Sequence, residues 1–597
     1  MAKAYDEVAG FNGPTWYAYT ENISEGNGSE SDPYLIMTAG QLAMLALEVN
    51  NGDSKEGKYY TIAADISLNK RAENLRVLWV PIGLDVDHPF SGTLTNPNGY
   101  SITGMMIDVS SVATTKYFGL FGYLKGTVDG IRIAGDSEIK LSGQGDYNAG
   151  LLCGYVDGGS YVKHCNVEDS YITGTNLVGS LDDSIYIGGL IGYNAQATGD
   201  GSENGRTYSC VVKTTISLEG NGSSSITAGG VIGRSYGKVL DCHAVVDMTA
   251  TAFSTSNESY LGGIIGRVDL GNLKYCSASG DISAGVGSHA VTGGAFGFVN
   301  SLYANSGKYR INIDYCVTTV AISGGHTLGG FIGYCYVGGD LYVDFTSDFS
   351  SSYIDASNAS YAGGFIGELE YSKRITDGKN IWLSQAGTGN GFIGTMKKPT
   401  TVNYGVILGH TTRVPDANLK VLPANQSRFY YNGDMCNYQI VGDNRTIEKI
   451  DNYGGHIPDG DGYGIYGIAY GNGASLQNPG PAALYNEEPA DQLEMCNTDN
   501  YKLCAMLFYI TNDKKTLYKG TDVTVDFSIE DIMNSTTGER VCQFTVPEDV
   551  TCVKVVDKHI YPLDPGEVVV TVKWNGLQRK VHLDITYGKD WTGGRNE

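Results

Sequence analysis

The sequence predicts an all-β protein whose main part is a parallel β-helix, a solenoid built by stacking coils of chain. A glycine-framed phrase recurs at intervals the size of one supersecondary unit, which is typical of repeat architectures. A second repeated phrase, built around cysteine, follows five of these copies. The 597 residues also include 82 Gly and 42 Tyr but only 15 Pro, and this composition suits short strands joined by tight corners.

The glycine phrase has the form Gly-Gly-apolar-Ile/Phe-Gly, and its closing glycines are 31 to 41 residues apart. The full copies span 188–192, 229–233, 262–266, 293–297, 329–333 and 363–367, and degenerate copies span 119–122 and 150–154. Such a unit holds two or three strands, so it fits one coil whose strands pair with their counterparts about 4.8 Å away. We expect the glycines to permit positive φ at coil corners and to let neighbouring rungs approach closely.

The cysteine phrase predicts a ladder of thiols inside the solenoid. Its cysteines are Cys165, Cys210, Cys242, Cys276 and Cys316, each 9 to 19 residues beyond a closing glycine. Equivalent positions in successive coils lie above one another, and cysteines there are typical of small buried hydrophobic residues. We therefore expect free thiols, and the total of twelve cysteines does not identify the redox compartment.

Charge argues against two classes of partner. The chain has 41 basic and 65 acidic residues, a formal net charge of −24, which repels phosphate backbones and anionic lipid. A nucleic-acid partner is therefore not expected. Membrane insertion is not expected either, because no stretch is long and apolar enough to cross a bilayer. The first residues contain no hydrophobic run typical of a signal peptide, which leaves open whether a leader was removed.

The first 125 residues predict how the array begins. Residues 1–30 form a polar N-terminal segment, and residues 31–125 form a cap and the first coils. Thr38 and Gln41 make a capping box for a helix that Asn51-Gly52 ends, and residues 60–68 alternate as a half-buried strand. We expect the amphipathic helix to cover the open end of the array, where the terminal coil would otherwise expose apolar core.

The two phrases together resemble the GLUG motif, found in tandem in bacterial surface proteins and beside immunoglobulin-A-cleaving metalloproteases. The resemblance covers roughly residues 25–370 and includes the lead-in Asp32-Pro33-Tyr34 and the turn Asn98-Gly99. One departure is Thr95-Asn-Pro-Asn98, where the family commonly has Asp-Gly before that turn. The resemblance implies a right-handed parallel β-helix over residues 126–410, exposed on the cell surface, and it implies no catalytic residue.

Beyond Gly367 the glycine repeat decays, and the last hundred residues change character. Phrases at 391–394 and 405–409 are interpreted as closing coils, and residues 411–500 as an irregular Gly/Tyr/Asp-rich connector or further closing coils. Residues 501–597 predict an immunoglobulin-like β-sandwich. Its strongest element is a hairpin, 567–574 and 577–587, that turns at Asn575-Gly576.

The register of this hairpin follows from its pattern. It places Val568 opposite Leu583, Val570 opposite Val581, Val572 opposite Arg579 and Trp574 opposite Leu577. Further strands are expected at 502–511, 521–529, 541–546 and 551–556.

Motifs that could carry catalysis have structural interpretations. No His-Glu-x-x-His occurs, so the zinc protease activity found beside such repeats does not carry over. A Gly-x-Ser-x-Gly spelling at 233–237 leads into another strand and is interpreted as a coil corner. The acidic pairs Glu168-Asp169 and Asp182-Asp183 are interpreted as solvated loop charges.

One segment could bind a ligand. Its candidate residues are Tyr453, His456, Asp459, Asp461, Tyr463 and Tyr466. Aromatic faces beside carboxylates could grip a sugar, and Asp459 and Asp461 could place two oxygens on Ca²⁺. No Glu follows at the twelfth position of an EF-hand loop, and no other cofactor is expected.

These observations predict a non-enzymatic, cell-surface or secreted protein that acts as an adhesin or structural display module and binds glycan or a surface protein. Two alternatives stay open. One is a polysaccharide lyase or hydrolase with carboxylates on neighbouring coils. The other is a phage tail or fibre protein, trimeric and located in the virion. Oligomeric state and ligand identity are not encoded in any recognisable pattern.

Overall fold

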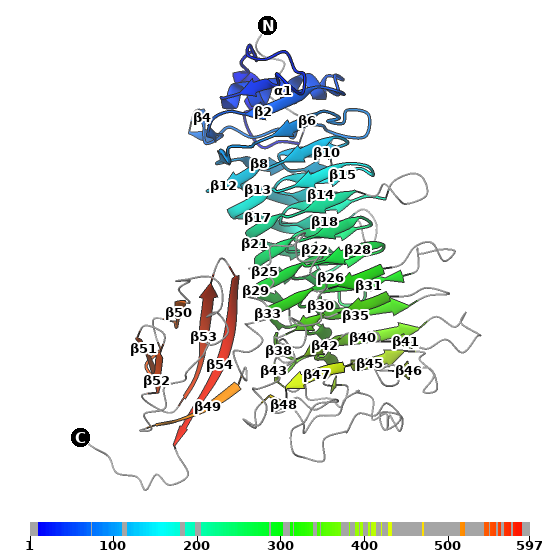
Figure 1. Ribbon diagram of the computed structural model, residues 1–597, viewed down its shortest axis with the longest axis vertical. Coiled ribbons are helices and arrows are strands. Elements are labelled where there is room, and N and C mark those ends of the chain that lie inside the picture. Colours follow the sequence, from blue (N-terminus) through cyan, green and yellow to red (C-terminus); the bar gives the residue numbers. More distant parts are fainter. Residues whose placement is uncertain are drawn as a thin grey trace.

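The chain forms a parallel β-solenoid (Figure 1). The structure is a computed structural model that describes residues 10–371, except 73, 110–115, 180–184, 197–204, 286–287, 302–310, 315, 338–342, 347 and 351. Beyond residue 371 it describes chiefly the strands named below. The predicted all-β class and the stacking of coils are confirmed for this part of the chain.

Helix α1 (Ala39–Asn50) lies at the N-terminal end of the solenoid (Figure 1). A 3₁₀ turn, Trp16–Tyr19, precedes it. The Thr38 hydroxyl accepts a hydrogen bond from the Gln41 amide at 3.2 Å, and Gly52 follows the helix with a φ of 103°. The predicted helix and its N-cap are therefore confirmed, although the Gln41 side chain bonds the Met37 amide rather than that of the cap residue.

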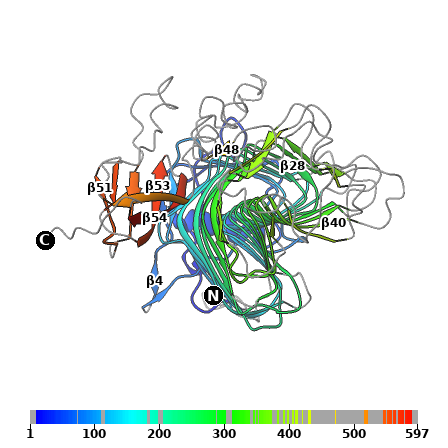
Figure 2. The ribbon, with the colours of Figure 1, turned by 90° about the horizontal axis from the view of Figure 1, so that it is seen from below.

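Four sheets run along the solenoid, and each full coil contributes one main strand to sheet 1, 2, 3 and 4 in that order. Figure 2, which looks along the stack, shows the coils superposed. Pairings between neighbouring described rungs of these sheets are parallel.

Sheet 1 contains β1 Tyr34–Ile36, β2 Tyr59–Ile62, β6 Thr93–Thr95, β11 Thr127–Asp129, β16 Tyr161–Lys163, β20 Arg206–Tyr208, β24 Lys238–Leu240, β28 Gly271–Lys274, β32 Ile311–Asp314 and β36 Val343–Thr346. The main path of sheet 2 contains β3 Ile66–Ser67, β7 Ser101–Thr103, β12 Arg132–Ala134, β17 Asn166–Val178, β21 Val211–Gly220, β25 His243–Thr251, β29 Ser277–Ala284, β33 Val317–Ser323, β37 Phe349–Ser350, β42 Gly389–Phe392, β47 Arg428–Asn432 and β48 Ala469–Tyr470. Beside that path lie β8 Met106–Val109, β13 Glu138–Gln144, β38 Tyr353–Asp355 and β43 Thr395–Lys397.

Sheet 3 contains β9 Tyr117–Phe118, β14 Tyr147–Gly150, β18 Ile185–Gly188, β22 Thr227–Gly229, β26 Ser259–Gly262, β30 Ala290–Gly293, β34 Thr327–Gly329, β39 Tyr361–Gly363 and β44 Tyr404–Gly405. Sheet 4 contains β10 Phe121–Leu124, β15 Cys153–Val156, β19 Ile191–Asn194, β23 Ile232–Ser235, β27 Ile265–Val268, β31 Phe296–Asn300, β35 Ile332–Val337, β40 Ile366–Tyr371 and β45 Leu408–Thr412. Two small pairs complete the solenoid, β4 Arg71–Ala72 with β5 Leu75–Arg76, and β41 Ile381–Trp382 with β46 Leu419–Lys420.

The single strand predicted over 60–68 is wrong, because a corner divides it. Strand β2 belongs to sheet 1 and β3 to sheet 2. The Asp65 carboxylate holds the corner by accepting hydrogen bonds from the backbone amide and hydroxyl of Ser101 in the next coil. Ile62 before the corner and Ile66 after it are both buried, so the pattern of inward-facing residues continues across the corner. The sequence pattern therefore gives no sign that the strand is divided.

The glycine phrase forms the corner between sheet 3 and sheet 4. In one copy β22 ends at Gly229 and β23 begins at Ile232. A Cβ on Gly230 would lie 2.1 Å from the carbonyl oxygen of Gly263 in the next coil, so only glycine fits there. The expected close approach is confirmed, but the expected positive φ is wrong, since no described glycine of the six full copies has a left-handed backbone.

The closing glycine of each phrase packs sheet 4 against sheet 3. A Cβ on Gly233 would lie 2.6 Å from the Gly192 carbonyl oxygen and 2.7 Å from the Ile187 amide nitrogen. Each sheet 4 strand therefore lies against the sheet 3 strand of the preceding coil, backbone to backbone. The phrase at 405–409 is a further copy, since Gly405 pairs with Gly363, whereas 391–392 lie in sheet 2 and are not equivalent.

The predicted cysteine ladder stands at the corner between sheet 1 and sheet 2. All five thiols are free and buried, as expected. The residue before each of the first four has a left-handed backbone with φ between 50° and 57°; these are His164, Ser209, Asp241 and Tyr275. Each thiol contacts the carbonyl oxygen two residues before it, 3.2 to 3.5 Å away. The thiols therefore line up along the interior.

One apolar core runs the length of the described solenoid, from α1 to β45. Large rings stack within it, such as Phe331 on Phe365 with centroids 4.9 Å apart. Because every coil buries equivalent positions, the core grows along the axis without a limit on length.

The C-terminal part contains a sheet in the order β49-β54-β53-β50, formed by Lys514–Lys519, Leu577–Tyr587, Gly566–Trp574 and Gln543–Thr545. The predicted hairpin is confirmed, with all four expected residue pairs of β53 and β54 opposite each other. Strand β54 lies beside β29 and β33 of sheet 2 (Figures 1 and 2).

The other strands predicted in the C-terminal part were found only in part. The sequence failed to predict β49, and the strands expected at 502–511 and 521–529 lie outside the described residues. Strands β50 and β51 (Val553–Val556) fall inside two predicted ranges, and β51 pairs with β52 (His559–Pro562). The immunoglobulin-like fold and the domain boundaries stay predictions.

Replacing Gly230 with alanine should destabilise the solenoid strongly, because the new methyl group overlaps the Gly263 carbonyl oxygen. We expect a loss of about 3 kcal/mol in the free energy of unfolding, measured by urea denaturation. Gly285→Ala is the control, since a Cβ there meets its nearest atom at 3.4 Å, and it should change stability by less than about 1 kcal/mol. Equal losses would contradict the packing role of the phrase.

The buried thiols should make the solenoid sensitive to alkali. Burial raises the pKa of Cys335 to about 12 and raises that of Cys153 further. Below the unfolded pKa of about 8.5 both states keep their protons, and above it only the unfolded state releases them, so stability falls as pH rises. Urea denaturation at pH 8 and pH 10 should show this fall, and it should be smaller in Cys335→Ala. An equal fall in the variant would refute the assignment to this thiol.

Candidate functional site

The residues predicted to bind a ligand, Tyr453, His456, Asp459, Asp461, Tyr463 and Tyr466, lie outside the described residues. The acidic pair Asp182-Asp183 does too. Within the described part of the chain, no three His, Cys, Asp or Glu side chains are arranged to hold a metal ion. The sugar and Ca²⁺ assignments therefore stay predictions.

The other acidic pair sits in strand β17 and is held by cations. Glu168 accepts two hydrogen bonds from the Arg132 guanidinium, at 3.0 and 2.9 Å. Asp169 pairs with the Lys213 ammonium at 2.6 Å. These carboxylates belong to a strand rather than to the expected loop, and each is directed to its own partner instead of to a shared substrate position.

The Gly-x-Ser-x-Gly spelling is a coil corner, as predicted. Ser235 ends β23, and the chain continues through a turn into strand β24, not into a helix. Its hydroxyl is fully buried and accepts hydrogen bonds from the Asn194 side chain and the Gly237 amide, at 3.3 and 3.2 Å. A nucleophile needs an exposed hydroxyl at a strand-to-helix turn, so Ser235 has a structural role.

A row of large side chains follows the closing glycines along sheet 4. We call it the post-glycine row; its members are Tyr123, Tyr155, Tyr193, Arg234, Arg267, Phe298 and Tyr334, in register from coil to coil. Tyr123 stacks on Tyr155 with ring centroids 4.6 Å apart, and Tyr155 stacks on Tyr193 at 5.0 Å. Ring faces therefore cover one another, and burial raises the pKa of Tyr193.

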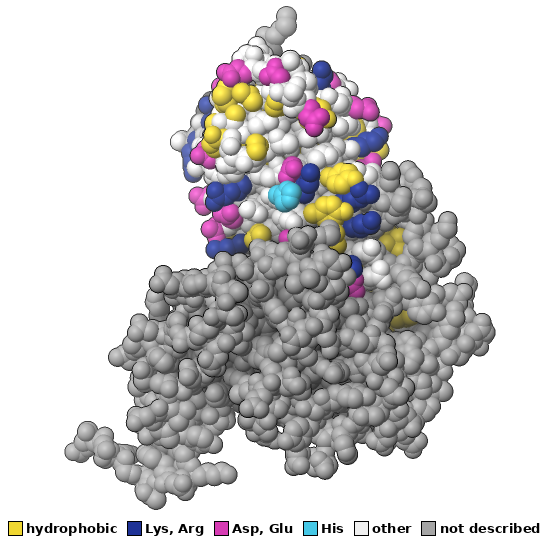
Figure 3. All heavy atoms as spheres, viewed as in Figure 1, with side chains coloured by type: hydrophobic (Ala, Val, Ile, Leu, Met, Phe, Trp, Pro, Cys, Tyr) yellow, Lys and Arg dark blue, Asp and Glu magenta, His cyan; other side chains and the backbone are white. Residues whose placement is uncertain are grey.

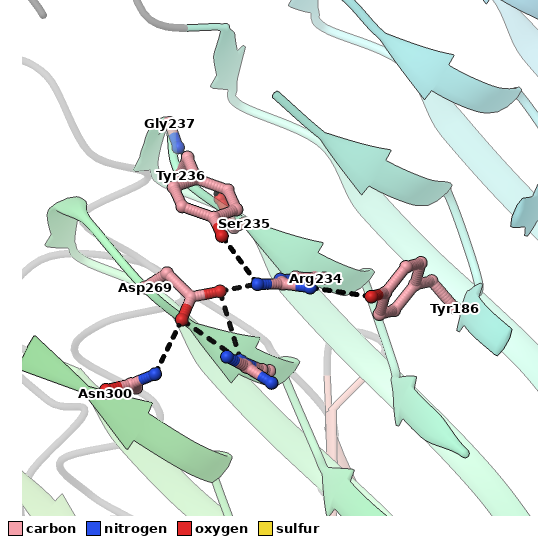
Figure 4. A network of polar contacts seen from close by, with 8 residues as sticks. Tyr186, Arg234, Ser235, Tyr236, Gly237, Asp269 and Asn300 are labelled. Atoms are coloured by element: carbon pink, nitrogen blue, oxygen red, sulfur yellow. Dashed lines mark hydrogen bonds and ion pairs between the residues drawn. The ribbon is translucent and has the colours of Figure 1, made fainter. Parts of the chain in front are cut away.

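Two arginines interrupt this row and share one carboxylate (Figure 4). Asp269, fully buried, accepts a hydrogen bond from Nε of Arg234 at 2.6 Å and from Nε of Arg267 at 3.0 Å. Arg234 also donates to the hydroxyls of Tyr186 and Tyr236, at 2.6 and 2.5 Å.

The network joins several coils. Its residues come from strands β18, β23 and β27, the turns after β23 and β27, and β31, whose Asn300 amide donates to Asp269 at 3.0 Å. Burial raises the pKa of Tyr236, and Asp269 adds to that rise while Arg234 opposes it. Because the polar atoms of the network are directed at one another, it acts as an internal strut and offers no open catalytic position.

A different surface, the outer face of sheet 1, carries half-buried cations. We call it the basic face; its residues are Tyr161 and Lys163 of β16, Arg206 and Tyr208 of β20, Lys238 of β24 and Lys274 of β28. These side chains alternate with the buried residues Val162, Thr207, Val239 and Leu273, so they point outward. Figure 3 shows basic side chains gathered beside apolar ones in the upper half of the face towards the viewer.

Contacts among the described residues order the basic face. The Arg206 guanidinium lies 4.9 Å from the centroid of the Tyr161 ring and donates a hydrogen bond to its hydroxyl. Lys163 pairs with Asp129 on the rung before, and Lys274 pairs with Asp314 on the rung after. Strands β16, β20, β24 and β28 themselves contain four basic residues and no acidic residue.

Sequence reasoning missed both features. The signal for the network was present at the residue after the closing glycine, where two copies have arginine, one has glutamate (Glu368) and the others have tyrosine or phenylalanine. The basic face had no comparable signal, because its residues are scattered over more than a hundred positions in a strongly acidic chain. Only the pairing of the rungs brings them to one surface.

Replacing Asp269 with asparagine should destabilise the solenoid, because two buried guanidinium groups would lose their only carboxylate in the network. We expect a loss of about 3 to 5 kcal/mol in the free energy of unfolding, measured with urea. Asp169→Asn breaks an exposed ion pair as the control and should cost less than about 1 kcal/mol.

The triple variant Arg234→Tyr, Arg267→Phe, Asp269→Asn repeats the residues of neighbouring coils and should recover most of that loss. If Asp269→Asn were as stable as the control, or if the triple variant recovered nothing, the strut would be refuted.

Comparisons with known proteins agree with the repeat architecture. The family model described as the GLUG motif matches residues 257–283. The chain is 33% identical over 138 residues to a protein of Evansella cellulosilytica provisionally named a Gly-rich membrane protein, covering 23% of this chain and 14% of that protein. It is 29% identical over 171 residues to halomucin of Haloquadratum walsbyi, covering 28% of this chain and 2% of halomucin.

The chain thus spans a small part of these relatives. Within the described residues, no helix is long and apolar enough to span a membrane. The chain carries a GLUG motif within a parallel β-solenoid.

Proposed function

We propose that this chain is a non-enzymatic module of a surface-exposed or secreted protein, which displays the side of a β-solenoid for binding glycan or a protein partner. The observation that carries the proposal is the division of each repeat into a fixed interior and a variable exterior. Glycines and cysteines recur where coils contact, while side chains that face outward change from rung to rung.

The names of two relatives support a surface location. One is described as a membrane protein and the other is halomucin. The acidic net charge of −24 keeps such a module soluble outside a membrane. A solenoid offers a long lateral surface for binding, and this geometry supports an adhesin or display role.

Finer features of the fold belong to the same proposal. We expect the right-handed coiling that the GLUG resemblance implies and a capping role for α1, whose apolar face joins the core of the first coils. The C-terminal sheet would be an immunoglobulin-like spacer or docking domain, consistent with its hairpin.

The first test asks whether the chain binds a ligand without converting it to a product. The purified chain should retain ligands on a glycan array or capture defined surface proteins, and it should release no new reducing ends or unsaturated sugars from acidic and neutral polysaccharides. Turnover that a single carboxylate change abolished would instead establish the lyase or hydrolase alternative. A stable trimer by mass in solution would favour the phage fibre alternative, whereas a monomer would argue against it.

A further inference from the structure

We propose that the basic face of sheet 1 binds a linear acidic polysaccharide, whose uronate carboxylates meet one cation on each of four successive rungs. This inference rests on the proposed function and names the ligand class and the surface. The cations are Lys163, Arg206, Lys238 and Lys274, contributed by β16, β20, β24 and β28.

Charge sorting between faces is the first argument. Strands β16 to β28 of sheet 1 carry four basic residues and no acidic one. The strands of the same coils in sheet 2, β17, β21, β25 and β29, carry five acidic residues and one basic residue. In a chain with a net charge of −24, a face of the opposite sign attracts anions locally, within about 10 Å at moderate salt.

Regular spacing is the second argument. Residues of one column repeat at the separation of parallel strands, about 4.8 Å. The outward side chains form two columns in register. Arg206 pairs with Lys238 in one column, and Lys163 and Lys274 lie in the other, separated by Tyr208 and Leu240, so each rung presents one cation in one of the two columns. A uronic acid chain carries one carboxylate per sugar, and a sugar ring in an extended chain is comparable in length to one rung. The polymer would therefore run along the stack of coils.

The third argument is the partial exposure of the lysine side chains and the position of their ion-pair partners. Lys163 and Lys274 keep about a third of their side chains exposed although each contacts an aspartate. Both carboxylates come from the rungs that flank the face, Asp129 from β11 and Asp314 from β32. Lys238 lies between them, and no carboxylate of the described chain is within ion-pair distance of it. Among the described residues, no carboxylate of this chain therefore neutralises Lys238 at the centre of the face.

Tyrosines favour a sugar over a nucleic acid on this face. Binding of single-stranded nucleic acid depends on bases stacking on open aromatic faces. The Arg206 guanidinium lies over the Tyr161 ring and donates to its hydroxyl. The arrangement therefore presents guanidinium N–H groups and a half-exposed Tyr208, which suit carboxylates and sugar hydroxyls.

The test uses the full chain and measures its affinity for polygalacturonate by titration calorimetry at low and high salt. Lys238→Glu reverses one central charge and should weaken binding by about tenfold, because a repelling contact replaces an attractive one. Lys238→Gln should weaken it less, and wild-type binding should decrease as salt increases. Lys140→Glu makes the same charge change on sheet 2 and is the matched control, expected to stay within about twofold. Thermal unfolding verifies that each variant is folded.

The other outcomes separate the two proposals. Equal weakening by Lys238→Glu and Lys140→Glu would overturn the assignment to this face. Binding of neutral glycans or of a protein without polygalacturonate binding would overturn the acidic ligand and leave the proposed function intact. Failure to bind any glycan or protein would overturn both. Tighter binding of a single-stranded oligonucleotide, lost in Lys238→Glu, would assign the face to nucleic acid and refute the polysaccharide.

Discussion

Close contact between glycine backbones is the constraint on which this solenoid depends. At the corner between sheets 3 and 4, a Cβ on Gly230 would come within 2.1 Å of the carbonyl oxygen of the next coil, and the equivalent glycines meet the same restriction. The closing glycines then bring sheet 4 onto sheet 3 with no side chain between them. Successive coils can stack in register only because these positions have no side chain. The cysteine ladder and the post-glycine row follow from that register.

Register turns a one-dimensional repeat into columns of like residues. The cysteines share one corner, the left-handed residues before them share another position, and the post-glycine row stacks ring on ring. Where two arginines enter that row, the same register places Asp269 between them. Buried charge is thus accommodated within the repeat, because Asp269 pairs with Arg267 of its own coil and with Arg234 of the coil before.

The outer surface of the solenoid is less constrained by packing than its interior. Side chains there contribute little to stacking, so their charges can vary between rungs, and the result is an acidic sheet 2 beside a basic face on sheet 1. A scaffold whose interior is fixed by packing can change its ligand without changing its fold. This separation is the physical reason for assigning function to the lateral surface and not to the repeated phrases.

The sequence by itself determined the features that local chemistry controls. These are the coil period, the capped helix α1, the buried thiols and the β53–β54 hairpin, whose Asn-Gly turn and alternation specify its register. It failed to predict the corner inside 60–68, because the alternation of buried and exposed residues continues through that corner. It also failed to predict the φ of the motif glycines, because a glycine can be required either for a positive φ or for a close backbone contact. Only the tertiary structure decided that Arg234 meets Asp269 and that Arg206 and Lys238 share a face. Those neighbours are set by pairing between coils, which no short stretch of sequence encodes.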